Sequence, residues 1–196
     1  DGREVAYVAG TIGVTPATRL AIRSAVDVAG GGEVRPSASS SQSDGLPAWS
    51  PDGELVRFAA CTGEWVCSWK ERGRLGGAVR PLPLPPLAQA QFVGGFPSWS
   101  PDGARLAFVV RDTIYVSTAA GAGARPVAVH PAGYLELHSL VWSPSGKWLA
   151  YVNGNRSWLF STNVAASSIW MGDADGGERP RRVTADEGLN ASPAGL

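Results

Sequence analysis

The pentapeptide "WSPDG" fills residues 49–53 and again residues 99–103, and "WSPSG" at residues 142–146 is a third copy. The chain also opens on Asp1-Gly2, which matches the last two letters of the motif. A Ser and an Asp in one tight loop can form part of an active site. A turn that returns once per structural unit belongs instead to the architecture. The segments that follow each copy decide between these interpretations.

Those following segments resemble one another. Each is a short apolar run with an aromatic residue at the same place, in "REVAYVAG", "ELVRFAAC", "ARLAFVVR" and "KWLAYVNG". A second run comes next in every unit, as "RLAIRSAV", "WVCSW", "TIYVSTA" and "SSIWMGDA". The runs are short, rich in β-branched and aromatic residues and bounded by turn formers, and none keeps a helical period, so they predict strands.

The repeat predicts the fold class. Copies return every 40 to 50 residues or so, a period typical of propellers and helical arrays, and the strand pattern excludes the helical arrays. We therefore expect one all-β region over residues 1–196, with approximate repeats 1–48, 49–98, 99–141 and 142–196. Each repeat is predicted to form a small antiparallel sheet, the blade of a β-propeller.

The pentapeptide then has a structural role at each of its positions. Pro presets the backbone for the second position of a type I turn, Asp or Ser bonds local amides, and Gly takes the left-handed position. Trp is expected to pack between adjacent blades. The residues assigned to this turn are Trp49, Pro51, Asp52, Gly53, Trp99, Pro101, Asp102, Gly103, Trp142, Pro144, Ser145 and Gly146.

The segments "PAWSPDGELVRFAA", "PSWSPDGARLAFVV" and "LVWSPSGKWLAYVN" resemble the WD40-like (PD40) repeats of TolB-type propellers. "SSIWMGDADGGERPRRVT" is similar to the second half of that repeat. The resemblance covers the chain as about four blades, and it implies either a four-bladed ring or an arc of a propeller with about six to eight blades. We favour the arc, and we expect a processed or partial chain because residue 1 is not Met.

Composition narrows the functional classes. Seventeen Lys and Arg balance seventeen Asp and Glu, so the formal net charge is zero. A protein without a basic excess is a poor candidate for binding nucleic acid through phosphates. No stretch approaches 18 apolar residues, so the sequence predicts no membrane-spanning helix.

The two cysteines, Cys61 and Cys67, flank the short segment 62–66 between two predicted strands. If that segment is a tight hairpin loop, the cysteines lie opposite each other and can form a cross-strand disulfide, which requires an oxidising compartment. The alternative is a pair of half-buried thiols. A zinc site is not expected, because such a site needs about four ligands.

Catalytic chemistry finds little support in the sequence. No G-x-S-x-G nucleophile elbow is present,. His130 and His138 are expected on the surface or on an edge strand. "DADGG" at residues 173–177 lacks the further ligands of a calcium loop and is read as a hairpin turn. We therefore expect no catalytic residue, no metal and no cofactor.

Two segments that do not repeat are candidates for partner contact. Pro81, Pro83, Pro85 and Pro86 lie in "PLPLPPL", which favours polyproline II and serves either as a docking segment or as a stiff connector. Trp158, Leu159 and Phe160 lie in an insertion within the last repeat, where apolar loop residues are typical of a contact surface or fold back on the blade.

These observations favour a non-enzymatic scaffold propeller, an accessory subunit that docks on other proteins at the extracytoplasmic face of a membrane-bound or envelope complex. The expected location is periplasmic or otherwise extracytoplasmic, with membrane association through partners. The resemblance leaves two alternatives open. One is the sensor propeller of a bacterial membrane Ser/Thr kinase, and the other is the gating propeller of a serine oligopeptidase whose catalytic domain is not in this chain.

Overall fold

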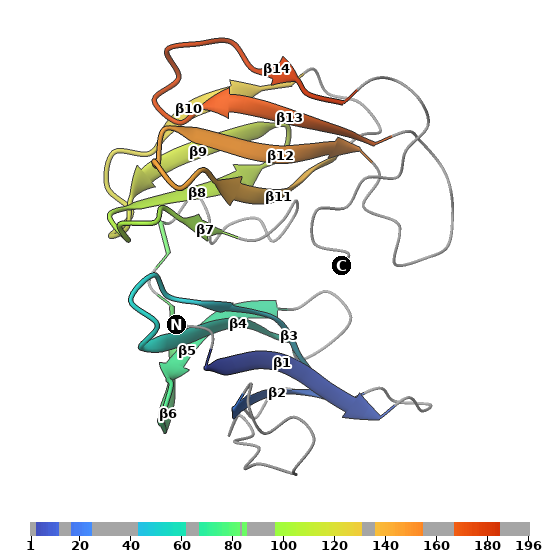
Figure 1. The fold of residues 1–196 in the computed structure, drawn as a ribbon, viewed down its shortest axis with the longest axis vertical. Helices are drawn as coiled ribbons and strands as arrows, with labels where there is room; N and C mark the ends of the chain where they lie inside the picture. The colour runs from blue at the N-terminus through green and yellow to red at the C-terminus, as the bar shows by residue number, and fades with distance from the viewer. Residues whose placement is uncertain are drawn as a thin grey trace. The chain divides into compact units, whose positions relative to one another are not determined.

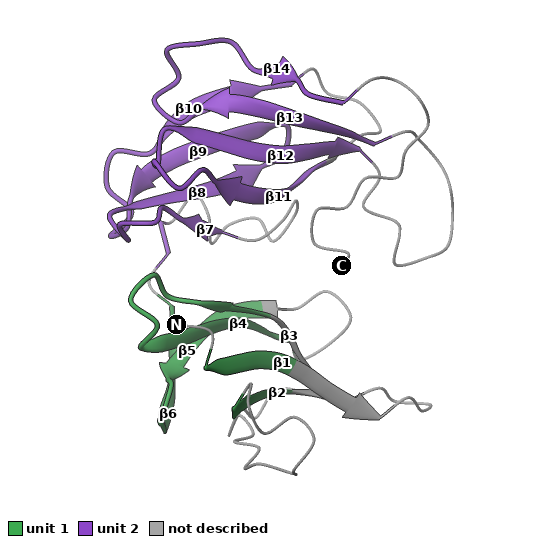
Figure 2. Cartoon of the chain, viewed as in Figure 1, with its two compact units in different colours: residues 1–82 green, residues 83–196 purple. Residues whose placement is uncertain are grey.

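The computed structural model describes residues 3–11, 17–24, 43–61, 67–82, 84–85, 97–130, 136–154 and 167–184. Within these ranges the regular elements are all strands, and every strand pairing is antiparallel (Figure 1). The chain divides into two compact units, residues 1–82 and residues 83–196, which are described separately (Figure 2).

The described residues of unit 1 form two sheets. Sheet A pairs β1 with β2, and sheet B has the order β3-β4-β5-β6, so each strand lies beside the next in sequence. The strands are β1 (Glu4–Thr11), β2 (Ala17–Ser24), β3 (Ser43–Trp49), β4 (Leu55–Cys61), β5 (Cys67–Gly73) and β6 (Gly76–Pro81).

The described residues of unit 2 form two four-stranded sheets of the same topology as sheet B. Sheet C runs β7-β8-β9-β10 and sheet D runs β11-β12-β13-β14. The strands are β7 (Ser98–Trp99), β8 (Arg105–Val110), β9 (Thr113–Thr118), β10 (Arg125–Val129), β11 (Glu136–Trp142), β12 (Trp148–Gly154), β13 (Ser168–Asp173) and β14 (Arg181–Arg182).

The four-stranded sheets are offset from the sequence repeats by one strand. Trp49, Trp99 and Trp142 end the first strand of sheets B, C and D, and the rest of the pentapeptide makes the turn into the second strand. Each sheet is therefore a four-stranded meander in which the repeated turn joins strands one and two, the arrangement of a propeller blade.

Each sheet has two faces, because side chains alternate along a strand. We call "odd" the face that carries the third and fifth residues after the turn glycine, such as Val56 and Phe58 in sheet B. The "even" face carries the fourth and sixth residues, such as Ala107 and Val109 in sheet C. Cross-strand partners share a face, so the register assigns every strand of a blade to these two surfaces,.

Both hydrophobic cores follow one rule. In unit 1, Leu20 and Ile22 on the even face of sheet A pack against Val56 and Phe58 on the odd face of sheet B. In unit 2, the even face of sheet C packs against Leu149 and other residues of the odd face of sheet D. Because the side chains at these positions are almost fully buried, apolar packing between faces stabilises each pair of neighbouring blades.

Candidate functional site

The pentapeptide turn is built around the serine hydroxyl. Ser50 Oγ accepts the N–H of Leu55 at 2.9 Å and donates to the Asp52 carboxylate. The Asp52 carboxylate also accepts the N–H of Glu54 at 3.0 Å. Gly53 closes the turn with a φ of 72° and donates its N–H to the Ser50 carbonyl at 2.8 Å. The Ser and Asp that looked like catalytic partners are therefore engaged by their own turn.

The other two copies repeat this geometry. Ser100 Oγ donates to Asp102 and accepts the N–H of Arg105 at 2.9 Å. In the third copy Ser143 and Ser145 hydroxyls lie 3.0 Å apart, and Ser143 Oγ accepts the N–H of Trp148 at 3.0 Å. The substitution of Asp by Ser at position 145 thus keeps the local hydrogen bond, as the sequence predicted.

The turn also sets the charge of its aspartates. The Ser50 hydroxyl and the N–H of Glu54 hold the pKa of Asp52 below its usual value. The Ser100 hydroxyl and the N–H of Ala104 lower the pKa of Asp102 in the same way. Both carboxylates stay ionised near neutral pH, where they accept hydrogen bonds and do not serve as general acids.

The motif tryptophan of the last sheet reaches the neighbouring sheet. Trp142 Nε1 donates to the carbonyl of Ser98 in β7 at 2.8 Å. The guanidinium of Arg105, in β8, lies 4.8 Å from the centroid of the Trp142 ring and donates to the carbonyl of Gly146. The tryptophan therefore packs between sheets C and D, and an arginine covers its ring.

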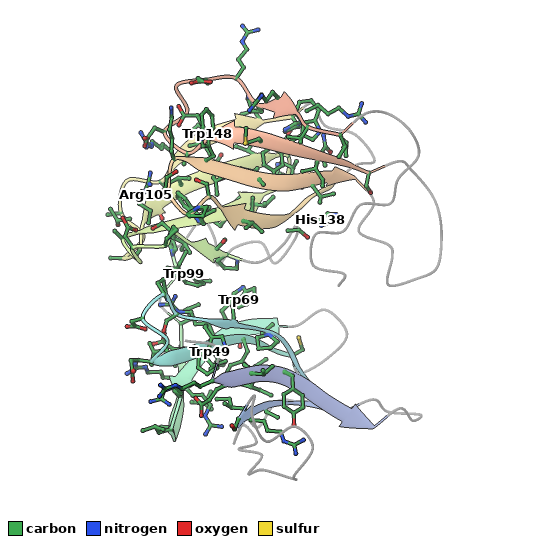
Figure 3. All side chains as sticks on the ribbon, in the orientation of Figure 1. Trp49, Trp69, Trp99, Arg105, His138 and Trp148 are labelled. Atoms are coloured by element: carbon green, nitrogen blue, oxygen red, sulfur yellow. The ribbon has the colours of Figure 1, made fainter. Side chains whose placement is uncertain are left out.

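Arg105 forms an ion pair in unit 2, and unit 1 has an ion pair at the corresponding place with the charges exchanged. Arg105 Nη1 lies 3.4 Å from Asp175 Oδ1, which Arg125 Nη2 also contacts at 2.6 Å. Glu4 is the second residue after Gly2 in the sequence, as Arg105 is after Gly103, and Glu4 Oε2 lies 3.2 Å from Arg74 Nη1. In both units this residue pairs with a residue of the connection between strands three and four of the next sheet. Figure 3 shows Arg105 and Trp148 at one end of unit 2 and His138 toward the other end.

The even face of sheet B differs from the apolar even faces of sheets A and C, because its centre is charged. Glu71 Oε1 accepts from Arg80 Nε at 2.8 Å, and Glu71 Oε2 lies 3.7 Å from Arg57 Nε. The Glu71 and Arg57 side chains are only 9% and 13% exposed, so this cluster holds ions that have lost most of their water,. Burial lowers the pKa of Arg57, and the Glu71 carboxylate opposes that shift.

Both histidines lie at edge strands, but neither is on the surface. His130 follows β10 and is 7% exposed, and His138 lies in β11 and is 5% exposed. His130 Nε2 contacts Tyr151 Oη at 2.7 Å, and His130 Nδ1 contacts Asn153 Nδ2 at 3.0 Å. The edge of the His130 ring meets the Trp170 ring at a centroid distance of 4.8 Å. The edge-strand alternative of the prediction therefore fits these positions, and both side chains are buried.

The cysteines occupy the hairpin between β4 and β5. The register places Cys61 directly opposite Cys67, and Cys61 is disulfide-bonded. Among the described residues no cysteine is free. A disulfide-bonded cysteine is typical of an oxidising compartment,.

The proposed contact segments are only partly described. Pro81 is exposed at the end of β6, whereas Pro85 is buried and its ring atoms lie against Gly121. Leu82 and Leu84 are each 7% exposed. In the described part of the run, Leu82, Leu84 and Pro85 are thus buried and Pro81 is exposed. Pro83, Pro86, Trp158, Leu159 and Phe160 lie outside the described residues.

The described residues hold no group of three or more His, Cys, Asp or Glu side chains that suits a metal ion. They also hold no helix that is long and apolar enough to cross a membrane.

Solved structures with the same fold are propeller proteins. The chain is 20% identical to TolB from Acinetobacter baumannii, with a TM-score of 0.65, over 96% of this chain and 43% of that protein. It is 16% identical to a TolB-type protein from Agrobacterium tumefaciens, with a TM-score of 0.61, over 90% of this chain and 60% of that protein. It is 12% identical to the acylaminoacyl peptidase from Pyrococcus horikoshii, with a TM-score of 0.53, over 94% of this chain and 31% of that protein.

These similarities support the fold and not a specific activity. The chain spans about half of each TolB protein and less than a third of the peptidase. No family model matches the chain, and no curated protein sequence matches it. The predicted all-β fold built of propeller blades is confirmed, and it is TolB-like.

Proposed function

We propose that this chain is a non-enzymatic interaction module, an accessory or scaffold propeller that docks on protein subunits at the extracytoplasmic face of a membrane-bound or envelope complex. One observation carries the proposal: the side chains that looked suited to catalysis are bonded within the framework. Ser50 and Ser100 bond to their own turns, and His130 is enclosed between Tyr151 and Asn153. Blades of this kind are rigid platforms whose loops present a large surface.

Two observations support the location and the kind of partner. Cys61 is disulfide-bonded, which is typical of proteins outside the reducing cytosol,. The repeat resembles that of TolB-type propellers, and two TolB structures share the fold. The resemblance implies the cell envelope as the setting, and the partners there are other proteins.

Photo-crosslinking of the tagged full-length protein in its native cells tests this proposal. A photo-reactive residue at Leu75, which is 74% exposed, is expected to crosslink a defined envelope or membrane subunit. A photo-reactive residue at Phe108, which is 2% exposed, is the control and is expected to yield no intermolecular product. The scaffold proposal would be overturned if the protein with the photo-reactive residue at Leu75 stays uncrosslinked and none of this protein is found in the membrane fraction.

An activity-based probe tests the non-enzymatic part separately. A fluorophosphonate reacts with activated serines, so the purified chain is expected to remain unlabelled. Labelling that disappears in a Ser50→Ala or Ser100→Ala variant would make the turn serine a nucleophile and defeat the proposal.

A second candidate function is the propeller of a serine oligopeptidase, because an acylaminoacyl peptidase shares the fold over 94% of this chain. Reading the complete gene separates the candidates. A hydrolase domain with a G-x-S-x-G elbow favours the peptidase, and a transmembrane segment with kinase motifs favours a sensor.

A further inference from the structure

The junction between sheets C and D is held at two ends that differ in chemistry. At one end, before β12 begins, Trp142 Nε1 donates to a backbone carbonyl of β7 at 2.8 Å, and Arg105 lies over the Trp142 ring. At the other end, His130 contacts Tyr151 and Asn153, which lie in the second half of β12. We call these two places the Trp142 end and the His130 end.

The contacts described for the Trp142 end keep their charge in mildly acidic solution. The Arg105 guanidinium, which donates to the carbonyl of Gly146, cannot lose its proton in a folded protein,. Its ion-pair partner Asp175 is a carboxylate, and carboxylates of this kind take up a proton only near pH 4,. The Trp142 end is therefore expected to stay packed between about pH 7.5 and about pH 5.5, the range in which histidine titrates.

The His130 end depends on a buried ring that can take up a proton. Both ring nitrogens are engaged, since Nε2 lies 2.7 Å from Tyr151 Oη and Nδ1 lies 3.0 Å from Asn153 Nδ2. The edge of the ring meets the Trp170 ring at a centroid distance of 4.8 Å. Because Nδ1 faces an amide nitrogen, a proton on Nδ1 would set two hydrogen-bond donors against each other. Protonation therefore removes a hydrogen bond between the sheets and places a charge where little water can reach it.

The charged and titratable groups near His130, among the described residues, come from both sheets. Sheet C contributes the Asp112 carboxylate, which favours a protonated ring. Sheet D contributes the Tyr151 hydroxyl, which burial keeps neutral, and Arg182, the cross-strand partner of Trp170. Arg182 has the same charge as a protonated ring and disfavours it. Burial outweighs the Asp112 carboxylate, so the pKa of His130 lies below its ordinary value.

We propose that His130 is a pH-sensitive latch on the junction between sheets C and D. The neutral ring holds the His130 end closed, and the protonated ring lets this end open locally while the Trp142 end stays packed. Local opening of this kind costs less free energy than global unfolding, so the chain keeps its fold. The latch does not depend on the scaffold function, because it concerns the purified chain alone.

The direction and the size of the effect follow from proton binding. In the open state the His130 ring is in water, where the pKa of histidine is about 6.5, and the closed state binds the proton less readily. The closed state is therefore fully favoured above about pH 6.5, and the open population grows as the pH falls below that value. At about pH 5.5, one unit lower, the ratio of open to closed molecules can rise at most about tenfold.

Two indole N–H groups report on the two ends separately. Trp170 Nε1 donates to Ser168 Oγ at 2.9 Å at the His130 end, and Trp142 Nε1 donates to β7 at the other end. Hydrogen exchange of these two assigned indole signals is measured by NMR at about pH 7.5 and about pH 5.5, and each rate is corrected for the exchange rate of a free indole at that pH. In acid the protection of the Trp170 indole is expected to fall several-fold, up to about tenfold, and that of Trp142 to stay the same.

Three variants assign the response to the His130 ring. His130→Gln keeps a hydrogen-bonding side chain but cannot titrate, so the protection of the Trp170 indole is expected to be equal at both pH values. Asn153→Asp places a carboxylate opposite Nδ1, where it accepts from the protonated ring, so this variant is expected to stay closed in acid,. His138→Gln is the matched control, because His138 is also buried but contacts Ser139 within β11, and it is expected to respond like wild type. Circular dichroism checks that each variant is folded.

Three outcomes contradict the latch. One is an equal loss of protection at Trp142 and Trp170, which would mean that acid loosens the whole junction. Another is a Trp170 indole whose protection in wild type does not change with pH. The third is a folded His130→Gln variant that keeps the wild-type response. If that variant does not fold, Asn153→Asp decides, since a wild-type response to acid in Asn153→Asp would also contradict the latch.

Discussion

His130 Nε2 lies 2.7 Å from Tyr151 Oη, so a residue that follows the outer strand of sheet C is hydrogen-bonded to the buried tyrosine of sheet D. The other ring nitrogen faces the Asn153 amide nitrogen at 3.0 Å. An amide N–H can donate only to an unprotonated Nδ1, so this geometry fits the neutral ring with its proton on Nε2. The junction between the two sheets is therefore assembled around an uncharged histidine.

The first prediction concerns pH. Burial lowers the pKa of His130, and the Asp112 carboxylate opposes this shift in part. The unfolded state then binds the proton more readily than the folded state, so stability is full above a pH of about 6.5 and is lost as the pH falls. Urea unfolding at several pH values is expected to show a free energy of unfolding that declines below that point.

His130→Leu is the variant that assigns this decline. It removes the titrating group and leaves the Tyr151 hydroxyl and the Asn153 amide without their hydrogen-bond partner, so it is expected to be less stable at neutral pH but to lose less stability on acidification,. The titratable groups near His130 are the Tyr151 hydroxyl, whose pKa is raised by burial, and the Asp112 carboxylate. An unchanged pH dependence in His130→Leu would assign the acid sensitivity to another residue.

The second prediction ranks the residues of the repeated turn. Ser100 is fully buried, and its hydroxyl both accepts the N–H of Arg105 and donates to Asp102. Ser100→Ala is therefore expected to lower the free energy of unfolding by about 1–2 kcal/mol, since it leaves a buried N–H without its acceptor. Asp102→Ala is expected to cost less, because the carboxylate is exposed and water can replace it. Chemical denaturation of both variants measures the order, and a larger loss for Asp102→Ala would contradict it.

This ranking shows what the sequence could predict. Pro and Gly impose local backbone angles, so the pentapeptide predicted its turn correctly, and the left-handed φ values of Gly53, Gly103 and Gly146 confirm it. The sequence did not predict the role of the serine. Its hydroxyl accepts the N–H of the residue five positions later, and this hydrogen bond depends on how the two strands leave the turn.

Contacts between sheets could not be read from the sequence, because they join distant residues. Arg105 and Asp175 are far apart in the chain and meet only when two blades stack. One signal was available: Glu4 and Arg105 hold the same place in the repeat, and a charge at a position that precedes a buried strand suggests a partner. His130 lies in a segment that does not repeat, so no comparison between units could reveal its partners Tyr151 and Asn153.

The third prediction concerns Arg105, which covers Trp142 and links sheets C and D. Arg105→Lys keeps the charge near Asp175 but loses the planar group over the ring and the bond to the Gly146 carbonyl,. It is expected to lower the free energy of unfolding by about 1 kcal/mol. Asp175→Asn is expected to cost less than this, because Asp175 is 63% exposed and surface ion pairs contribute little,. Thermal unfolding at low and high salt distinguishes the two effects, since only the ion pair is screened. Equal losses of unfolding free energy in the two variants would show that the ion pair contributes more than the contact of Arg105 with the Trp142 ring.

The fourth prediction concerns the charged cluster on sheet B. Glu71→Gln removes the carboxylate that faces both Arg57 and Arg80 while keeping the size of the side chain. Because Arg57 is largely buried, the loss of its counter-ion is expected to lower the free energy of unfolding by about 2 kcal/mol. Arg80→Gln is the matched control, and since Arg80 is 62% exposed it is expected to cost much less,. Equal losses in the two variants would mean that burial of the cluster does not decide its contribution.

The last prediction concerns the hairpin that carries both cysteines. Because Cys61 is disulfide-bonded and stands directly opposite Cys67 in the register, we predict a Cys61–Cys67 disulfide. Intact mass under non-reducing conditions is expected to be about two hydrogens below the reduced mass, and digestion is expected to recover the two cysteines in one linked peptide. A disulfide that closes so short a loop reduces the entropy of the unfolded chain and thereby stabilises the fold by about 2 kcal/mol. Reductant is therefore expected to lower the free energy of unfolding of the wild type by about that amount. A Cys61→Ser, Cys67→Ser double variant is the control, because it is expected to match reduced wild type and to show no response to reductant. Free thiols in protein purified from its native compartment would contradict the disulfide, and with it the oxidising location that the scaffold proposal assumes.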